Sequence, residues 1–434
     1  MIIFIYIFFI IHMFEEFLIR GLVFLLNYRF FLRADFISYL RFYCEIDNIS
    51  WILIILRLWL ILICLLSVEK NHIINYSLLL NLFFVLLFRL IITFSLKNFL
   101  FFYFILELSF LPLFYIVLGW GYISDRFIAG YYLMFYTIVG SLPFLMIILY
   151  SILKLNITNF YILDLSIGLI KNRFFLFFLF LFIFLIKFPL YGLHLWLLKA
   201  HVEAPVFGSI ILAGIILKLG GYGIWRFYRI WSLNILGKEF FIFWGVWGGI
   251  LISYICIIRN DVKLLVASSS VVHIRFCICC FFLLTNFSSK SRVLIIVGHG
   301  LCSSGLFYFC NIFYCVFSRR RLTVSKGLII ISPPFVLFWG LFCLGNIACP
   351  PTINLLSELM IISSLLCFEK SLFFVIFFLS FFSSCYRLYL FYIFSFDNNY
   401  LRYFNFRLLN INSLNISILH LLPLNLLIIS TFIF

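Results

Sequence analysis

Six titratable side chains lie within long apolar stretches of this chain, and their residue types are suited to moving protons. They are two glutamates, two lysines and two histidines, namely Glu107, Lys187, Lys218, His273, His299 and Glu358. Burial and nearby charges shift the protonation of all three residue types. Each charged group costs about 2.5–3.5 kcal/mol at the centre of a membrane-spanning helix. A proton relay explains the six together, whereas a spacer would gain nothing from them.

Two of the six residues lie beside prolines that predict interrupted helices. Lys187 precedes Pro189 by two residues, and Glu358 follows the pair Pro350 and Pro351. Proline removes a backbone donor and breaks the helical hydrogen-bond ladder, so polar backbone groups become free next to the titratable side chain. Broken helices at corresponding places in two halves are typical of transporters built from inverted repeats.

Glu107 and Lys187 are suited to act as a pair. Glu107 has no basic residue within one helical turn, so it needs a partner from another helix. Burial disfavours the charged form of both residue types, whereas a nearby opposite charge favours it. Changing their separation would therefore load or release a proton. A pKa change of about two to three units is worth roughly 3–4 kcal/mol, which exceeds the ~2.3 kcal/mol for moving one charge against 100 mV.

The other titratable residues have small or polar neighbours. Lys218 is followed closely by three glycines, which allow another helix or water to approach. His273 follows a run of serines, and His299 lies among glycines and serines, so both helices could hold water. Lys187 and His194 are seven residues apart, which predicts that they share one helix face.

Arginine is left out of this relay because a guanidinium does not release its proton at physiological pH. Four arginines nevertheless lie inside apolar stretches: Arg57, Arg89, Arg275 and Arg387. We expect them to make ion pairs or contacts with lipid headgroups.

The composition predicts an all-α polytopic membrane protein. Hydrophobic residues make up 66% of the chain and charged residues 11%, with a mean hydropathy of +1.23. These values exclude a soluble globular domain. Apolar stretches of roughly 17–25 residues predict about thirteen or fourteen transmembrane helices. The segments 327–346 and 352–367 are so close that we expect two halves of one discontinuous helix.

The charged and sulfur-containing residues indicate membrane lipids as partners, with no nucleic acid and no metal. The chain has 31 basic and 15 acidic residues, but the basic ones are scattered between spans, which favours anchoring at the membrane surface. Only 319–321 and Lys326 form a cluster, read as a solvated loop or headgroup contact. Most of the 13 cysteines lie in apolar stretches as small hydrophobes. Cys277 and Cys280 lack a second pair at ligand spacing.

The choice of apolar residues indicates synthesis inside an organelle. The chain has 62 phenylalanines and 5 methionines, a bias that T-rich codons of a small organellar genome would produce. No Arg- and Ser-rich targeting segment is visible at the start.

The titratable residues lie in segments that resemble the antiporter-like membrane subunits of proton-pumping NADH:ubiquinone oxidoreductase, respiratory complex I, and among them the chain 4 type. The segments are LELSFLP from Leu106, RFIAGYYLMFYTIVGSLPFL from Arg126, KFPLYGLHLWLLKAHVEAP from Lys187, LKLGGYG from Leu217, DVKLLVASSSVVH from Asp261, GHGLCSSGLF from Gly298 and PPTINLLSEL from Pro350. The stretch 187–205 is the most specific, and it favours chain 4 over the related chains 2 and 5.

The resemblance implies a fold of about fourteen helices with two inverted five-helix repeats. It implies one transmembrane domain over 1–434, in which 1–95 holds divergent N-terminal helices, 97–227 and 240–394 hold the repeat cores, and 408–434 holds a C-terminal helix. Glu107 and Lys187 would be the ion pair of the first half. The other four residues would form a hydrophilic axis that ends at Glu358.

The resemblance also implies partners and a location in the mitochondrial inner membrane. Such chains hold no cofactor, so NADH, FMN, iron–sulfur clusters and ubiquinone are expected in partner subunits. Antiporter-like chains 2 and 5 are expected as neighbours. The alternative function is a subunit of a multisubunit cation/proton antiporter, because related chains there share the glutamate, lysine and broken-helix pattern.

Departures from the family pattern are limited. Leu198 stands where proline is usual, and the first hundred residues match poorly. Arg275 follows His273 where the pattern is apolar. A positive charge so close would disfavour protonation of His273 unless a carboxylate compensates.

Overall fold

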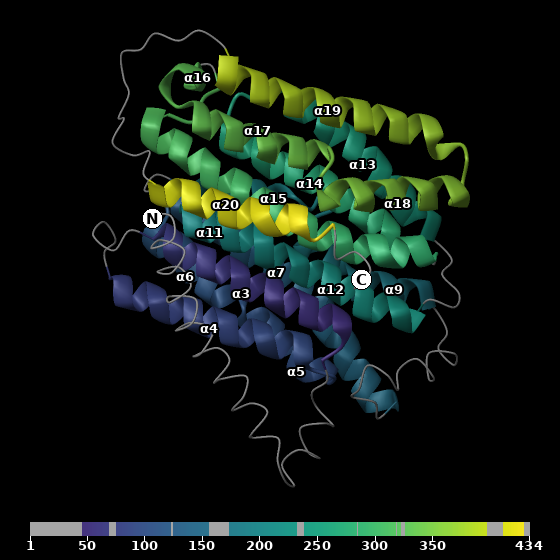
Figure 1. Ribbon diagram of the computed structural model, residues 1–434. Helices are drawn as coiled ribbons and strands as arrows, with labels where there is room; N and C mark the ends of the chain where they lie inside the picture. Colours follow the sequence, from purple (N-terminus) through teal and green to yellow (C-terminus); the bar gives the residue numbers. More distant parts are fainter. Residues whose placement is uncertain are drawn as a thin grey trace.

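The computed structural model describes most of the chain as a bundle of helices (Figure 1). The described residues are 46–68, 75–122, 125–155, 173–231, 238–283, 285–317, 319–322, 326–396 and 411–428. The helix expected within 1–32 lies outside these residues.

All regular elements in the described residues are helical, which confirms the all-α class. In chain order they are α3 (Asn48–Ser67), α4 (Tyr76–Ser95), α5 (Phe99–Leu108), α6 (Phe110–Trp120), α7 (Arg126–Leu155), α9 (Arg173–Lys187), α10 (Leu195–Glu203), α11 (Val206–Ile211), the π-helix η3 (Leu212–Ile216), α12 (Leu217–Trp231), α13 (Lys238–Ile258), α14 (Val262–Phe281), α15 (Asn286–Phe317), α16 (Leu328–Ile331), α17 (Pro333–Ile347), α18 (Ile353–Phe368), α19 (Leu372–Phe396) and α20 (Ile411–Leu426).

Fewer uninterrupted spans are present in the described residues than the sequence predicts. Nine helical segments there are long and apolar enough to cross a bilayer, and three shorter apolar helices accompany them. We expected about thirteen or fourteen spans. Two of those expected spans are broken into shorter helices, and the first expected span is not described.

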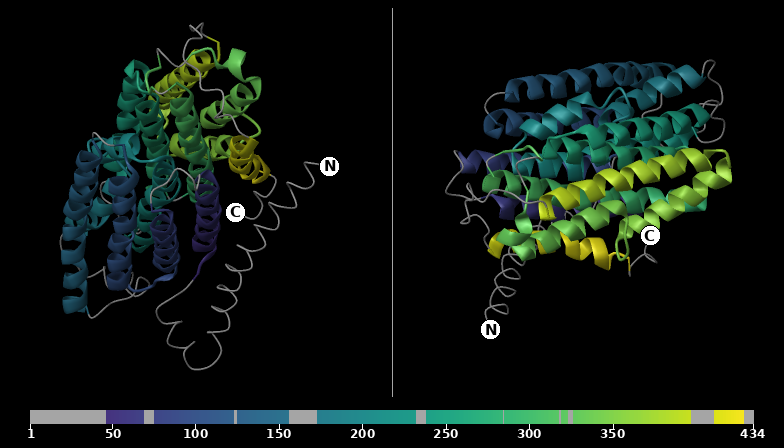
Figure 2. Two further views of the ribbon diagram at one scale, coloured as in Figure 1. Left: turned by 90° about the vertical axis from the view of Figure 1, so that its left-hand side faces the viewer. Right: turned by 90° about the horizontal axis from the view of Figure 1, so that it is seen from above.

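The helices run alongside one another, and the two halves of the chain occupy different sides of the bundle (Figures 1 and 2). The apolar parts of α14, α15 and the α11 to α12 segment are almost entirely buried, whereas only 33% of the apolar part of α4 and of α19 is buried. Large apolar side chains such as Phe84 and Phe374 cover these outer faces. Because lipid is as apolar as the core, the outer faces need no polar residues. The centre of the bundle is therefore built from α12, α14 and α15.

The first predicted break follows Lys187. α9 ends there, residues 188–194 are not helical, and α10 then begins. The free backbone groups find partners: Trp196 Nε1 donates to Ile186 O at 3.0 Å, and Leu190 N donates to Leu185 O at 3.1 Å. α7 packs against both α9 and α10, so the two short helices share one long neighbour.

The second predicted break separates α17 from α18 at residues 348–352. Figure 1 shows α18 continuing beyond the end of α17, which confirms two halves of a discontinuous helix. Cys349 N donates to Leu344 O at 3.0 Å. Asn354 Nδ2 donates to Gly345 O at 2.9 Å. These bonds satisfy carbonyls at the end of α17, as buried backbone groups require.

The glycines after Lys218 place α12 close to α9, as expected. A Cβ atom at Gly220 would lie 2.7 Å from the backbone nitrogen of Phe188. A Cβ atom at Gly223 would lie 2.0 Å from the Phe184 ring. Both distances are shorter than any real Cβ contact, so the approach of the two helices requires glycine.

One end of the bundle holds a network of charged residues around the turn between α13 and α14. Arg320 Nη1 lies 3.4 Å from Glu203 Oε1, where α10 ends. The guanidinium lies 4.3 Å from the Tyr122 ring centroid, and Lys263 Nζ lies 4.8 Å from it. Burial raises the pKa of Tyr122 to about 12, so its ring stays neutral between two cations. The reading of the 319–321 cluster as a solvated loop or headgroup contact is therefore wrong for Arg320.

Candidate functional site

Glu107 and Lys187 form an ion pair between α5 and the end of α9. Lys187 Nζ lies 2.9 Å from Glu107 Oε1. The lysine side chain is fully buried, whereas 22% of the glutamate side chain is exposed. Nζ also lies 4.2 Å from the ring centroid of Phe110, within cation–π distance. Glu107 thus has the partner from another helix that the sequence predicts.

Lys218 and His299 form a second buried contact, between α12 and α15. Lys218 Nζ and His299 Nδ1 lie 2.8 Å apart, and both side chains are buried. A charged ammonium has donors and no lone pair, so Nδ1 accepts the hydrogen bond and a neutral His299 carries its proton on Nε2. The two side chains can therefore share one excess proton between nitrogen atoms that are already in hydrogen-bond contact.

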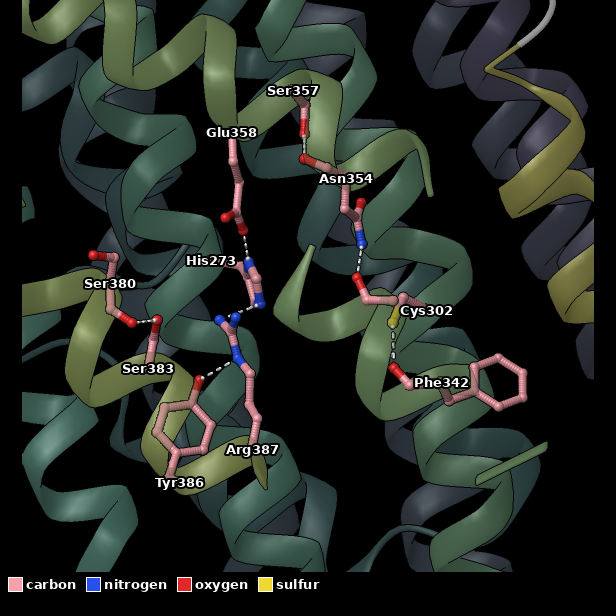
Figure 3. Close-up of polar contacts among 11 residues, drawn as sticks. His273, Cys302, Phe342, Asn354, Ser357, Glu358, Ser380, Ser383, Tyr386 and Arg387 are labelled. Atoms are coloured by element: carbon pink, nitrogen blue, oxygen red, sulfur yellow. Dashed lines mark hydrogen bonds and ion pairs between the residues drawn. The ribbon is translucent and has the colours of Figure 1, made fainter. Parts of the chain in front are cut away.

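His273 bridges a carboxylate and a guanidinium (Figure 3). Its Nδ1 lies 3.2 Å from Oε1 of Glu358 on α18. Its Nε2 lies 2.7 Å from Nη2 of Arg387 on α19. Arg387 Nε donates in turn to the hydroxyl of Tyr386 at 3.2 Å. The imidazole is 2% exposed, and the side chain of Asn346 on α17 also forms a hydrogen bond with it.

Arg387 and Glu358 determine the protonation state and the tautomer of His273. Arg387 has only donors, so Nε2 of His273 must accept and carry no hydrogen. The remaining ring proton is then on Nδ1, where it is donated to Glu358. This arrangement holds a neutral His273. Taking up a second proton requires Arg387 to move away from the ring.

Four of the six predicted residues are brought into one row. The rings of His273 and His299 lie 5.4 Å apart between centroids, so the Lys218 contact and the Glu358 contact join through the histidines. Glu107 and Lys187 form a separate group, connected to this row through the packing of α9 on α12.

The surroundings of these residues differ from the sequence reasoning at His194 and Arg387, and Glu358 is the carboxylate that compensates positive charge near His273. His194 does not share a helix face with Lys187, because the helix is interrupted between them, and its ring stacks on Tyr191 instead. Arg275 does not affect His273 by direct contact: its guanidinium lies near Tyr191 and in the space left by Gly248. The arginine that contacts His273 is Arg387, which the sequence reasoning assigned to ion pairs or headgroups.

Two further buried histidines escaped the sequence reasoning. His201 on α10 stacks on Phe307 with 4.2 Å between ring centroids, and both its nitrogens lack a hydrogen-bond partner among the described residues. His420 Nδ1 on α20 lies 3.1 Å from Ser304 Oγ. His201 could have been found from its position in 187–205, the stretch with the most specific resemblance to the family. No motif near His420 in the sequence marks that residue as functional.

The fold is similar to those of solved membrane subunits. A chain of "Respiratory complex I from Thermus thermophilus with bound NADH" superposes with a TM-score of 0.78 at 20% identity, covering 88% of this chain and 81% of that one. A chain of "Structure of Mrp complex from Dietzia sp. DQ12-45-1b" has a TM-score of 0.77 at 16% identity, covering 87% of this chain and 42% of that one. The chain therefore has the fold of these membrane subunits.

Sequence comparison narrows the class. Residues 96–383 match the family model described as NADH:quinone oxidoreductase/Mrp antiporter, TM. NADH-ubiquinone oxidoreductase chain 4 of Locusta migratoria is 39% identical over 384 residues, covering 86% of this chain and 85% of the relative. Chain 4 of Ceratitis capitata is 37% identical over 385 residues, covering 86% and 84%. The chain therefore belongs to this antiporter-like family, within the group of NADH-ubiquinone oxidoreductase chain 4 proteins.

Proposed function

We propose that this chain moves protons through two linked groups of side chains, the Glu107 and Lys187 pair and the row from Lys218 to Glu358. The chain is an antiporter-like, proton-translocating membrane subunit of respiratory complex I, and it spans the mitochondrial inner membrane many times. It contributes to NADH:ubiquinone oxidoreductase activity as a subunit of the complex. The energy comes from redox chemistry in other subunits.

The observation that carries the proposal is the buried row of Lys218, His299, His273 and Glu358. Two of its three steps are direct contacts of 2.8 Å and 3.2 Å, and the third is a histidine to histidine step of 5.4 Å between centroids. General acid–base transfer needs heavy atoms within hydrogen-bond reach or one water apart. The contacts of Lys218 with His299 and of His273 with Glu358 meet that requirement, and the step between the two histidines becomes available when Arg387 moves off Nε2 of His273.

The Glu107 and Lys187 ion pair can drive proton transfer along this row. While Glu107 and Lys187 remain 2.9 Å apart, each stabilises the charged form of the other. At about 4 Å, two charges interact by roughly 4 kcal/mol in a medium of effective dielectric constant near 20. Opening the pair costs that energy and closing it returns the same amount, which is enough to shift the protonation of a neighbouring lysine. Lys218 is the buried lysine on the helix that packs against α9, with the contact at Gly220.

We further propose that the chain contains two inverted five-helix repeats, 97–227 and 240–394, in one domain. Support comes from the two breaks, one after Lys187 and one before Glu358. Each broken helix is followed by a helix with a buried cation, Lys218 on α12 and Arg387 on α19. Antiporter-like chains 2 and 5 are the proposed neighbours. NADH, FMN, iron–sulfur clusters and ubiquinone are assigned to partner subunits.

The runner-up function is a subunit of a multisubunit cation/proton antiporter, which the similarity to a chain of the Mrp complex favours. The chain 4 relatives favour the respiratory complex. Purification of the native chain separates the two: the proposal expects NADH dehydrogenase activity to co-purify with it. Co-purification with sodium/proton exchange and without that activity would establish the runner-up.

The relay itself is tested by Glu358→Gln in the assembled complex. Glutamine keeps the shape and a hydrogen bond to His273 but takes no proton. We expect proton translocation per NADH oxidised to fall, while assembly persists. Glu369→Gln is the matched control, because Glu369 is exposed beyond the end of α18. Equal translocation by the two variants would remove Glu358 from the relay.

A further inference from the structure

A polar row continues along α12 beyond Lys218, on the same helix face. Lys218, Tyr222 and Arg226 are spaced four residues apart, which places them one above another. Arg226 Nε donates to the Tyr222 hydroxyl at 2.8 Å. Arg226 Nη1 lies 2.5 Å from Oδ2 of Asp47, the residue before α3. This row leads from the centre of the bundle toward a partly exposed carboxylate, so it is a possible second route for protons.

A second buried arginine flanks the same row. Arg57 on α3 is 2% exposed, and its guanidinium carbon lies 3.2 Å from the ring centroid of Phe94. Its Nη1 donates to Leu90 O at 3.2 Å. The Phe94 ring meets the Tyr222 ring edge-on, with 4.5 Å between centroids. Two buried arginines therefore lie beside the paired rings of Phe94 and Tyr222, and Arg226 forms an ion pair with Asp47.

These groups have the chemistry of a barrier. A guanidinium stays protonated at physiological pH, so neither arginine can pass a proton on. The Tyr222 hydroxyl accepts from Arg226 and donates to Phe94 O at 2.9 Å, which fixes its orientation. Fixed positive charge beside a proton route raises the barrier for protons and cations, as arginine does in water-selective channels.

We propose that Arg57 and Arg226 close the route along α12 and so direct protons on Lys218 toward His299. They would determine the specificity of the route without carrying protons themselves. This inference rests on the proposed function, because it takes Lys218 to be a proton-carrying group.

The test measures passive proton flux through the purified complex in liposomes, without NADH. A potassium diffusion potential drives the flux, and a pH dye enclosed in the vesicles records it. We expect Arg226→Gln to raise the flux on the order of tenfold, which corresponds to lowering the barrier by about 1.4 kcal/mol. Arg226→Lys keeps the positive charge, so its passive proton flux should equal that of the native complex.

Controls separate charge from packing and from general damage. Arg320→Gln removes an arginine from a comparable ion pair with Glu203 at another site, and it should leave the flux unchanged. Adding Lys218→Met to Arg226→Gln should suppress the new flux, because the route then lacks its inner proton carrier. If Arg226→Gln does not assemble, Arg57→Gln and Arg57→Lys provide the same comparison.

Each result decides a different claim. No rise with Arg226→Gln, or an equal rise with Arg226→Lys, overturns the barrier and leaves the relay intact. A rise that persists after Lys218→Met also overturns it, because the flux would bypass Lys218. Normal NADH-driven translocation in the single variant Lys218→Met instead overturns the proposed function.

Discussion

Breaking the Glu107 and Lys187 pair should uncouple the chain from the redox reaction. The substitution Glu107→Gln keeps the shape of the side chain and its hydrogen-bonding ability but removes the negative charge. Lys187 is fully buried, so it depends on this partner for its charged form. Phe110, whose ring centroid is 4.2 Å from Nζ, offers only a weaker cation–π contact in its place.

The magnitude follows from burial. Removing one partner of a fully buried ion pair costs about 3–5 kcal/mol. The Glu107 side chain is 22% exposed, so solvent screens part of the interaction and about 2–3 kcal/mol is the expected loss for charged Lys187. That loss lowers the ratio of charged to neutral lysine by roughly 30- to 150-fold.

The assay compares NADH oxidation with proton uptake by the purified complex in liposomes. We expect Glu107→Gln to lose proton uptake while the complex remains assembled. Lys187→Met should behave in the same way, and the double variant should be no worse than either single one, because residues that act as a unit are not additive. Lys290→Met, an exposed lysine on α15, is the control. Normal uptake in either single variant, or additive losses in the double variant, would refute the role of the pair.

Two other predictions test the row of histidines and the helix packing. Arg387→Gln removes the guanidinium that donates to Nε2 of His273, so the ring can hold a second proton. We therefore expect the optimum pH of proton translocation to change. An unchanged pH profile would show that Arg387 does not control the protonation of His273. Gly223→Ala places a Cβ atom 2.0 Å from the Phe184 ring. We expect a loss of about 1–3 kcal/mol in stability, measured as a lower melting temperature of the complex. An unchanged melting temperature would contradict the close packing of α9 and α12.

The titratable residues of the site and the two helix interruptions could be predicted from the sequence, because both depend on local chemistry. A proline next to a titratable residue breaks the helix wherever the chain lies, so the interruptions after Lys187 and before Glu358 could be predicted. A buried glutamate without a local partner must find one elsewhere, which predicted the contact of Glu107.

The contacts between side chains on different helices could not be predicted in the same way. The contact of Arg387 with His273 depends on how α19 is rotated against α14, and the neighbours of an arginine along the chain do not encode that rotation. Arg275 points away from His273 for a different reason, because residues two apart lie on different faces of one helix. The relation of His194 to Lys187 failed because a helical face ends where the helix is interrupted.

The most direct test of the account counts protons. The measurement is the number of protons translocated per NADH oxidised by the complex in liposomes, compared between the native chain and Lys218→Met. Lys218 has a contact of 2.8 Å with His299 at the start of the buried row, and methionine fills a similar volume without a titratable group. The account predicts a lower count for Lys218→Met in a complex that still assembles. An unchanged count in that complex would contradict the claim that protons pass along this row.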